Sequence, residues 1–467
     1  MRNVLFVSLG CDKNLVDSEK MLGLLNEAGY HVAQEESEAD AIVVNTCCFI
    51  HDAKEESVET ILEMAEWKKK GTLKALIVTG CMAQRYQEEI QQEIPEVDAV
   101  IGTTGYTEIV PILDEILDAA EASQTKDLTE TEEQKEKSFV NCCPSIDLLP
   151  ASLADKRVVT TGGYTAYLKI AEGCNKRCTY CIIPYIRGHY RSFPMEDLLE
   201  EARKLAESGV KELILIAQET TVYGMDCYGR KALPELLTKL CEIEGIEWIR
   251  ILYCYPEEIT DELIAVLKKE KKICHYLDIP IQHSEDTILK RMGRRTNREE
   301  LVSLVEKLRK EIPDIILRTT LITGFPGETE QEFNNMVDFV DSMEFDRLGV
   351  FPYSVEEGTK AAEMDHQIAE DVKESRRDEI MALQQEISAA KAESRIGQEM
   401  SVLIEGYLYE DDIYIGRTYM DAPKVDGNVF VRAEEELISG DMVPVRITGA
   451  SEYDLMGDVI YADEFTE

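Results

Sequence analysis

The stretch from Tyr164 to Ser354 alternates strand-like apolar runs with helical patterns six times. The runs are short and rich in Ile, Leu, Val and Tyr, and amphipathic segments of helical periodicity separate them. Repeated strand and helix units of this kind build a parallel sheet. We therefore predict a partial (βα)6 barrel, whose functional loops gather at the carboxyl ends of its strands.

Three cysteines follow the first of these runs, in the string GCNKRCTYC. Cys174, Cys178 and Cys181 are separated by three and then two residues. Three thiolates at this spacing can hold three irons of a 4Fe-4S cluster and leave the fourth iron open, as radical chemistry on S-adenosylmethionine (SAM) requires. Zinc is the alternative, but zinc usually takes paired ligands from two knuckles, and the sequence has no second CxxC. We expect a cluster that binds SAM, in a loop that Gly173 allows to turn sharply.

The first hundred residues form a smaller α/β pattern. Strand-like runs alternate with helical segments, and in chain order these elements cover residues 3–8, 18–28, 41–45, 57–69 and 73–79. This order predicts a parallel sheet with helices on both faces.

A cysteine follows each of the three strands in this N-terminal pattern: Cys11, Cys47 and Cys81. The carboxyl ends of parallel strands share one edge of the sheet, so the three thiols can converge. Small buried cysteines that fill turns are the alternative. Three at equivalent strand ends favour a second cluster site. Cys48 adjoins Cys47, but successive residues point opposite ways, and Cys47 continues the pattern of the other two.

The chain divides into four expected segments. They are an N-terminal cluster domain at 1–116, a polar linker at 117–160, the barrel at 161–396 and a small β-barrel at 397–467. The last segment holds five short strand patterns without helices, which is typical of a nucleic-acid-binding barrel. From Gln398 onward, however, 17 acidic residues stand against four basic ones. This barrel is poorly charged for RNA.

Several other polar residues read as structural. Cys142 and Cys143 lie within the linker, after its charged stretch ends at Ser138; they could form a redox or spare metal site, but we expect a lightly constrained loop. His283 is expected to be structural, and Glu356 and Glu357 are expected to be solvated surface charges.

The charge of the whole chain favours a cationic partner, and the alternative is that it only keeps the protein soluble. The formal net charge is -42, and this works against binding to a dense phosphate backbone. The sequence shows no membrane span and no signal peptide pattern, and its 13 cysteines are unlike a secreted disulfide framework. We expect a soluble, cytoplasmic protein with no membrane partner.

The order of these three domains resembles the methylthiotransferase branch of the radical-SAM enzymes over nearly the whole chain. The matching motifs include SLGCDKN, NTCCFI, VTGC and GCNKRCTYCIIP. Four further strings look like the RimO type, which modifies an aspartate of a ribosomal protein: YLDIPIQH, TGFPGET, GVFPYSVEEGT and DAPKVDG. Cys48 departs from the family, where glycine is common.

The resemblance implies two 4Fe-4S clusters, SAM and a radical reaction. Cys174, Cys178 and Cys181 would hold the cluster that cleaves SAM, and the N-terminal cysteines would hold an auxiliary cluster that carries the methylthio group. Residues that match SAM-contacting positions or lie at strand ends are Tyr180, Gln218, Gln282 and Gly324.

The implied substrate is a basic small-subunit ribosomal protein, modified at the β-carbon of an aspartate. An electron donor such as flavodoxin or ferredoxin is implied as a partner. An acidic enzyme complements a basic protein substrate, so nucleic acid is not the expected substrate. Two alternatives remain open: a tRNA adenosine methylthiotransferase, and a non-catalytic iron–sulfur sensor.

Overall fold

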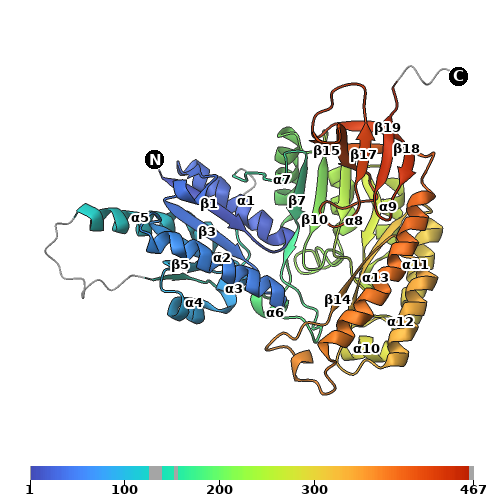
Figure 1. Ribbon diagram of the computed structural model, residues 1–467, viewed down its shortest axis with the longest axis horizontal. Helices are drawn as coiled ribbons and strands as arrows, with labels where there is room; N and C mark the ends of the chain where they lie inside the picture. The colour runs from blue at the N-terminus through green and yellow to red at the C-terminus, as the bar shows by residue number, and fades with distance from the viewer. Residues whose placement is uncertain (1, 126–138, 152–155, 462–467) are drawn as a thin grey trace. The chain divides into compact units, whose positions relative to one another are not determined.

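The computed structural model describes residues 2–125, 139–151 and 156–461 (Figure 1). The chain forms two compact units, each assembled from separate stretches of sequence. The first comprises Met1–Thr160, Ala171–Glu201 and Ser354–Thr359, and the second comprises Thr161–Ile170, Ala202–Tyr353 and Lys360–Glu467. Both sets of three cysteines therefore lie in the first unit.

The first unit is built on a six-stranded parallel sheet in the order β2-β1-β3-β4-β5-β6. Its central strands are β1 (Asn3–Ser8), β3 (Ala41–Thr46) and β4 (Ala75–Gly80), and every residue of the last two is buried. Strands buried on both faces read as continuous apolar runs, which is why they stand out in the sequence. The outer strands are β2 (His31–Val32), β5 (Ala99–Ile101) and β6 (Val140–Cys142).

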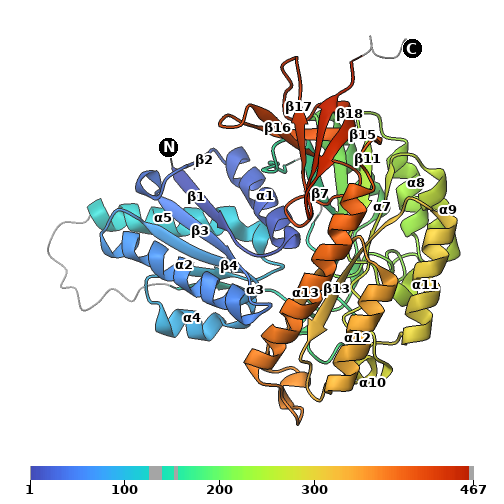
Figure 2. The same cartoon turned by 45° about the vertical axis from the view of Figure 1, so that its right-hand side comes forward.

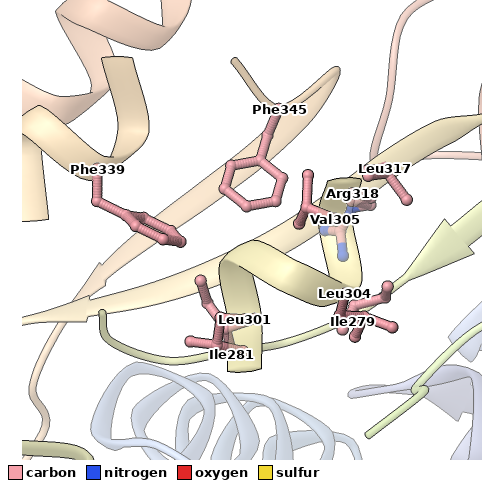
Figure 3. Close-up of a pocket in the computed structure, with 9 residues that line it drawn as sticks. All are labelled: Ile279, Ile281, Leu301, Leu304, Val305, Leu317, Arg318, Phe339 and Phe345. Carbon is pink, nitrogen blue, oxygen red and sulfur yellow. The ribbon is translucent and has the colours of Figure 1, made fainter. Parts of the chain in front are cut away.

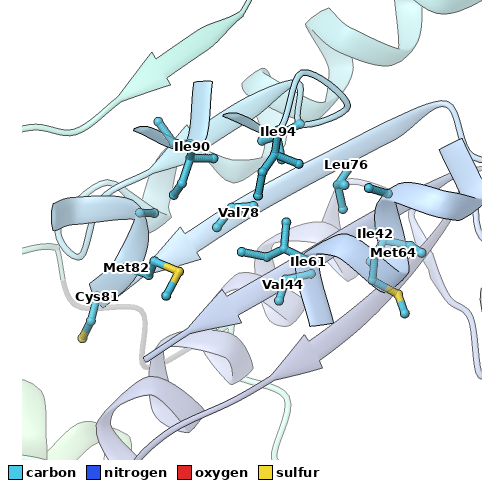
Figure 4. Close-up of a cluster of buried hydrophobic side chains, with 14 of the residues drawn as sticks. Ile42, Val44, Ile61, Met64, Leu76, Val78, Cys81, Met82, Ile90 and Ile94 are labelled. Carbon is cyan, nitrogen blue, oxygen red and sulfur yellow. The ribbon is translucent and has the colours of Figure 1, made fainter. Parts of the chain in front are cut away.

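Helices cover both faces of this sheet. One apolar cluster joins the sheet to α1 (Asp12–Glu27) and α5 (Ile109–Thr125). The other joins it to α2 (His51–Lys69), α3 (Cys81–Arg85) and α4 (Gln87–Glu93). Figure 4 shows this second cluster, where side chains of the strands and helices interlock and Cys81 lies at its edge.

The expected linker at 117–160 contains regular structure. Helix α5 continues through Thr125, and β6 adds a sixth strand beside β5. The polar sequence hid both elements, because α5 exposes one face and β6 is a short edge strand. Cys142 consequently ends a strand rather than lying in an unconstrained loop, and Cys143 packs against the apolar cluster of Figure 4. The charged stretch 126–138 lies outside the described residues.

The second unit contains the predicted six-stranded parallel sheet, in the order β14-β13-β12-β11-β10-β7. Each strand pairs with its neighbour in the parallel sense. The strands are β7 (Thr165–Lys169), β10 (Glu212–Ile216), β11 (Trp248–Ile251), β12 (Ile273–Asp278), β13 (Ile316–Thr323) and β14 (Arg347–Pro352).

Helices of the second unit pack along this sheet (Figure 2). They are α8 (Leu233–Cys241), α9 (Asp261–Lys269), α10 (Asp286–Arg291), α11 (Arg298–Glu311), α12 (Glu330–Met343) and α13 (Glu370–Glu393). Capping boxes begin α11 at Asn297 and α12 at Thr329. The small pocket in Figure 3 lies among apolar side chains of β13, α11 and α12, so it belongs to the core.

The chain ends in a closed five-stranded barrel, as the strand patterns predicted. Its order is β15-β16-β17-β19-β18. The strands are β15 (Glu399–Leu408), β16 (Ile413–Arg417), β17 (Val429–Arg432), β18 (Met442–Ala450) and β19 (Leu455–Val459). Closure pairs every strand on both sides and leaves no free edge.

A buried ion network joins this barrel to the amino end of the parallel sheet within the second unit. The carboxylate of Glu212, at the start of β10, lies 2.9 Å from Nε of Arg250 and 2.6 Å from Nη2 of Arg417. All three side chains are at most 1% exposed. The motif DAPKVDG lies beside it: Asp426 accepts a 2.7 Å hydrogen bond from the Tyr276 hydroxyl, and Asp421 pairs with Arg347.

Candidate functional site

The Cys174 loop follows strand β7 in the chain, as the sequence predicted. Gly173 adopts φ 81°, and a Cβ there would run into the carbonyl oxygen of His189. The Cys174 amide donates to the Gly188 carbonyl at 3.1 Å, and the Cys181 amide donates to the Cys178 carbonyl at 3.1 Å. These contacts hold the loop in a tight turn. The remaining short elements here are β8 (Ala171–Glu172), α6 (Ile183–Ile186), β9 (Arg191–Ser192) and α7 (Met195–Glu207).

The second cysteine set lies at one edge of the N-terminal sheet. Cys11 precedes α1, Cys47 follows β3 and Cys81 begins α3, and the strands that lead to them are adjacent in the sheet. Cys11 is exposed, while Cys47 and Cys81 are 8% and 6% exposed. The strands that lead to the three cysteines are therefore neighbours in the sheet, as predicted.

Two glycines let these strand ends pack closely. Gly10 has φ 87°, and a Cβ there would lie 2.8 Å from Cβ and 3.2 Å from Sγ of Cys47. Gly80 has φ 91°, and a Cβ there would meet the side chain of Asn45 and lie 2.6 Å from the Thr46 carbonyl oxygen. Any larger residue would push the loops apart.

Buried asparagines tie the same loops together. The Asn14 amide donates to the Thr46 carbonyl at 2.8 Å. Asn45 donates to the Asn14 carbonyl and to the Ser18 hydroxyl, each at 2.8 Å. Because these polar groups are buried, each lost hydrogen bond would leave an unsatisfied partner, so the network rigidifies the edge.

The side chains of Cys47 and Cys48 face different surroundings. Cys47 lies against Gly10, whereas Cys48 is fully buried in the apolar cluster that joins the sheet to α2, α3 and α4. Burial raises the pKa of Cys48 to about 12, and it also raises the pKa of Cys47. The choice of Cys47 over Cys48 as the ligand stays a prediction.

The chemistry of the N-terminal set fits an iron–sulfur cluster. Burial raises the pKa of the Cys81 thiol, Arg187 lowers it, and the neighbouring Cys48, Cys47 and Cys11 raise it further. Soft thiolates at one sheet edge suit iron and sulfide. Within the described residues, no three His, Cys, Asp or Glu side chains gather closely enough to hold a metal ion. Both ligand sets therefore remain predictions.

The expected SAM contacts fall in both units. Tyr180 lies between Cys178 and Cys181 in the first unit. In the second unit, Gln218 follows β10, and Gln282 and Gly324 are both brought to the end of β13. Gln282 adopts φ 73° and exchanges 2.8 Å backbone hydrogen bonds with β13. The structure thus places these three at the carboxyl edge of the parallel sheet.

A buried charged group behind Gly324 was missed by the sequence analysis. Glu328 accepts a 3.0 Å hydrogen bond from the Gly324 amide and pairs with Arg376 at 2.7 Å. Nε2 of His283 lies 3.3 Å from the same carboxylate, and both side chains are fully buried. His283 is thus a buried partner of the loop that carries Gly324. The pattern GFPGE names Glu328, but only the fold brings Arg376 to it.

The expectation for Glu356 is wrong. Its side chain is 3% exposed and pairs with Lys54 at 2.6 Å and with Arg85. These partners lie far away in the sequence, so local polarity misled the analysis. Glu357, at 65% exposed, is indeed at the surface, where its carboxylate accepts from Tyr86 and Arg85.

Comparison with known protein families identifies the domains. The model of "Uncharacterized protein family UPF0004" matches residues 3–102, that of the radical SAM superfamily matches 168–340, and that of the TRAM domain matches 396–460. A protein of Lachnoclostridium phytofermentans named ribosomal protein uS12 methylthiotransferase RimO is 63% identical over 97% of this chain and 99% of its own length. A protein of the same name from Clostridioides difficile is 50% identical over 99% of both.

The chain belongs to the RimO family. It is a radical-SAM methylthiotransferase, and its superfamily uses SAM with a 4Fe-4S cluster. Within the described part of the chain, no helix is both long and apolar enough to cross a bilayer.

Solved structures share the fold of this RimO family member. A radical SAM methyltransferase, TsrM, from Kitasatospora setae, solved with tryptophan substrate and a SAM analogue bound, superposes with a TM-score of 0.52. The match covers 86% of this chain and 78% of that one, at 14% identity. At this identity the likeness supports the fold alone.

Proposed function

We propose that this enzyme adds a methylthio group to the β-carbon of an aspartate in ribosomal protein uS12. The observation that carries the proposal is the 63% identity, over 97% of this chain, to a protein named uS12 methylthiotransferase. The two sets of three cysteines that follow predicted strands support it. The β C–H bond of an aspartate carries no proton acidic enough for base catalysis, so a radical must remove the hydrogen. A loop that offers three thiolates to a SAM-binding cluster suits this need.

The roles proposed for the two sets follow from their number and position. Cys174, Cys178 and Cys181 would hold the cluster that supplies an electron to SAM, and Cys11, Cys47 and Cys81 would hold a second 4Fe-4S cluster that serves sulfur transfer. Gly10 and the Asn14 network would keep the second set of loops together.

Residues at the strand ends of the second unit are proposed to orient SAM. Gln282 and Gly324 share the end of β13, and Glu328 holds the Gly324 loop through a backbone hydrogen bond. Gln218 lies at the same edge of that sheet. Tyr180, beside the cysteines, is proposed to contact the adenine. Each side chain here binds or orients, because the chemistry belongs to the cofactors.

Charge supports a basic protein partner. The chain carries 92 acidic and 50 basic residues. On the C-terminal barrel, Tyr409 is 88% exposed beside Tyr407 and Tyr414, and Glu410 to Asp412 follow in the hairpin. Carboxylates and aromatic faces both attract lysine and arginine side chains. We propose that this surface binds uS12.

We also propose that the enzyme works in the cytoplasm. There, flavodoxin or ferredoxin would donate electrons to it.

A mass measurement tests this function. The protein is reconstituted anaerobically with iron and sulfide and incubated with SAM, dithionite and either ribosomes or bulk tRNA. A mass gain equal to replacement of one hydrogen by a methylthio group, placed on an aspartate of uS12 by fragmentation, is expected.

Two variants separate the roles of the cysteine sets in this assay. Alanine at Cys174, Cys178 and Cys181 should abolish SAM cleavage. Alanine at the N-terminal set should abolish methylthiolation but leave SAM cleavage in place. The same gain on tRNA adenosine would contradict the substrate, and a protein unable to cleave SAM would support a sensor instead.

A further inference from the structure

Arg187 carries a buried charge that contacts the N-terminal cysteine set in the first unit. It lies between α6 and β9, a few residues after Cys181, and its side chain is 1% exposed. A guanidinium stays protonated in proteins, so this is a permanent positive charge in the interior. Such a charge is costly unless it is paired and hydrogen-bonded.

The guanidinium divides its contacts between carboxylates and the second cysteine set. Nη1 lies 3.0 Å from Oδ2 of Asp17 and 3.2 Å from Oε2 of Glu172. Nη2 donates to Oδ1 of Asn14 and lies 3.4 Å from Sγ of Cys81. One arm is therefore held by carboxylates, and the other reaches a thiol proposed as a cluster ligand.

The contacts also join the loops that carry both sets. Glu172 directly precedes Gly173 and Cys174, while Asn14 lies three residues after Cys11. An apolar side chain could fill the same volume without loss of unfolding free energy, because replacing buried ion pairs with packed apolar groups is often neutral or stabilising. The contact with the Cys81 thiol distinguishes Arg187 from a buried arginine that only pairs with carboxylates.

We propose that Arg187 is a positioning residue that fixes the Cys81 ligand and raises the reduction potential of the N-terminal cluster. This inference rests on the proposed function, in which Cys11, Cys47 and Cys81 hold that cluster. Hydrogen bonds to cluster sulfurs and nearby positive charge both favour the reduced, more negative state. Asp17 and Glu172 orient the guanidinium and partly offset its charge.

Redox titration of the N-terminal cluster tests the role. The full-length protein with alanine at Cys174, Cys178 and Cys181 retains only the N-terminal set and is reconstituted anaerobically. Its midpoint potential is read by electron paramagnetic resonance. Arg187→Met should lower the potential, so that at the original midpoint the ratio of reduced to oxidised cluster falls at least tenfold, which is about 59 mV for one electron.

We expect a second variant to shift the midpoint potential in the opposite direction. Asp17→Asn removes one of the carboxylates that offset Arg187 and should raise the potential. This variant retains the Arg187 side chain, so it tests the inference even where Arg187→Met fails to fold. Arg187→Lys keeps the charge and should shift the potential less than Arg187→Met.

Arg157 provides a matched control in the same unit. Its side chain is 2% exposed, and it pairs with Glu19 at 2.9 Å and with Glu201 at 2.8 Å. Arg157→Met should destabilise the protein without moving the potential. Equal shifts from both arginine variants, or an unchanged potential in Arg187→Met and Asp17→Asn, would overturn the role of Arg187. A background protein that binds no iron would instead overturn the proposed second cluster, and the inference with it.

Discussion

Replacing Glu212 with glutamine should weaken the second unit more than any exposed carboxylate replacement. Burial alone would raise the pKa of Glu212, but Arg417 and Arg250 outweigh burial and hold this pKa at about 2. Against an ordinary value of 4.5, this corresponds to about 3 kcal/mol of unfolding free energy. Breaking a buried pair by removing one partner costs about 3–5 kcal/mol. The two arguments agree in magnitude.

The pH dependence carries a definite sign. Because the folded pKa of Glu212 lies below the unfolded one, its contribution is complete above pH 4.5 and is lost as the pH falls toward 2. Glu212→Gln cannot titrate, so the difference in unfolding free energy between wild type and variant should shrink across this window.

The fluorescence of Trp248 makes the unfolding measurement specific to the second unit. The chain has two tryptophans, and Trp67→Phe leaves only Trp248, which lies in β11 two residues before Arg250. Urea unfolding followed by tryptophan fluorescence then reports on the second unit. Glu235→Gln is the control, because its ion pairs with Arg230 and Lys239 are partly exposed and such pairs contribute about 0–1 kcal/mol. A loss below about 1 kcal/mol for Glu212→Gln, or a difference that does not change between pH 5 and pH 3, would refute the reasoning.

Three further changes have definite expected outcomes. Gly10→Ala should lower the amount of iron bound by the N-terminal cysteines, because the new Cβ would meet Cys47. Gly29→Ala is the control: Gly29 also has φ 87°, but no atom lies within 4 Å of a Cβ there, so full iron content is expected. Equal iron loss in both variants would contradict this prediction. Glu356→Gln should lower the melting temperature, because Lys54 would lose its carboxylate and Arg85 would keep only the exposed Glu357, whereas Glu357→Gln should not lower it. Asp426→Asn should speed proteolysis of the C-terminal barrel and leave SAM cleavage intact. An unchanged rate of proteolysis would contradict the role of Asp426 in holding the barrel against the parallel sheet.

The sequence predicted most of the fold because its strands are buried on both faces. Continuous apolar runs mark β3 and β4, and the cysteines that follow them were placed correctly at one sheet edge. Helix starts were less accurate: α1 begins at Asp12 and α2 at His51, each six residues before the expected start. Their first turns are polar, so apolar periodicity does not reveal them.

Buried charges could not be predicted, because their partners are distant in the chain. Arg187 meets Asp17 across 170 positions, and Lys54 meets Glu356 across 302. Sequence reading treats a lone charged residue as solvated, which is right for most of the acidic surface and wrong for Glu356. Only the fold shows which charges are interior.

The motif DAPKVDG lies away from the residues that are expected to bind SAM. Asp421 and Asp426 face Arg347, Arg318 and Tyr276, at the amino end of the parallel sheet, whereas the expected SAM residues Gln282 and Gly324 lie at the carboxyl end. The motif therefore cannot select a substrate by touching the reacting atoms from this position. It holds the C-terminal barrel against the sheet through buried ions, and any effect on substrate choice must act through where that barrel is held.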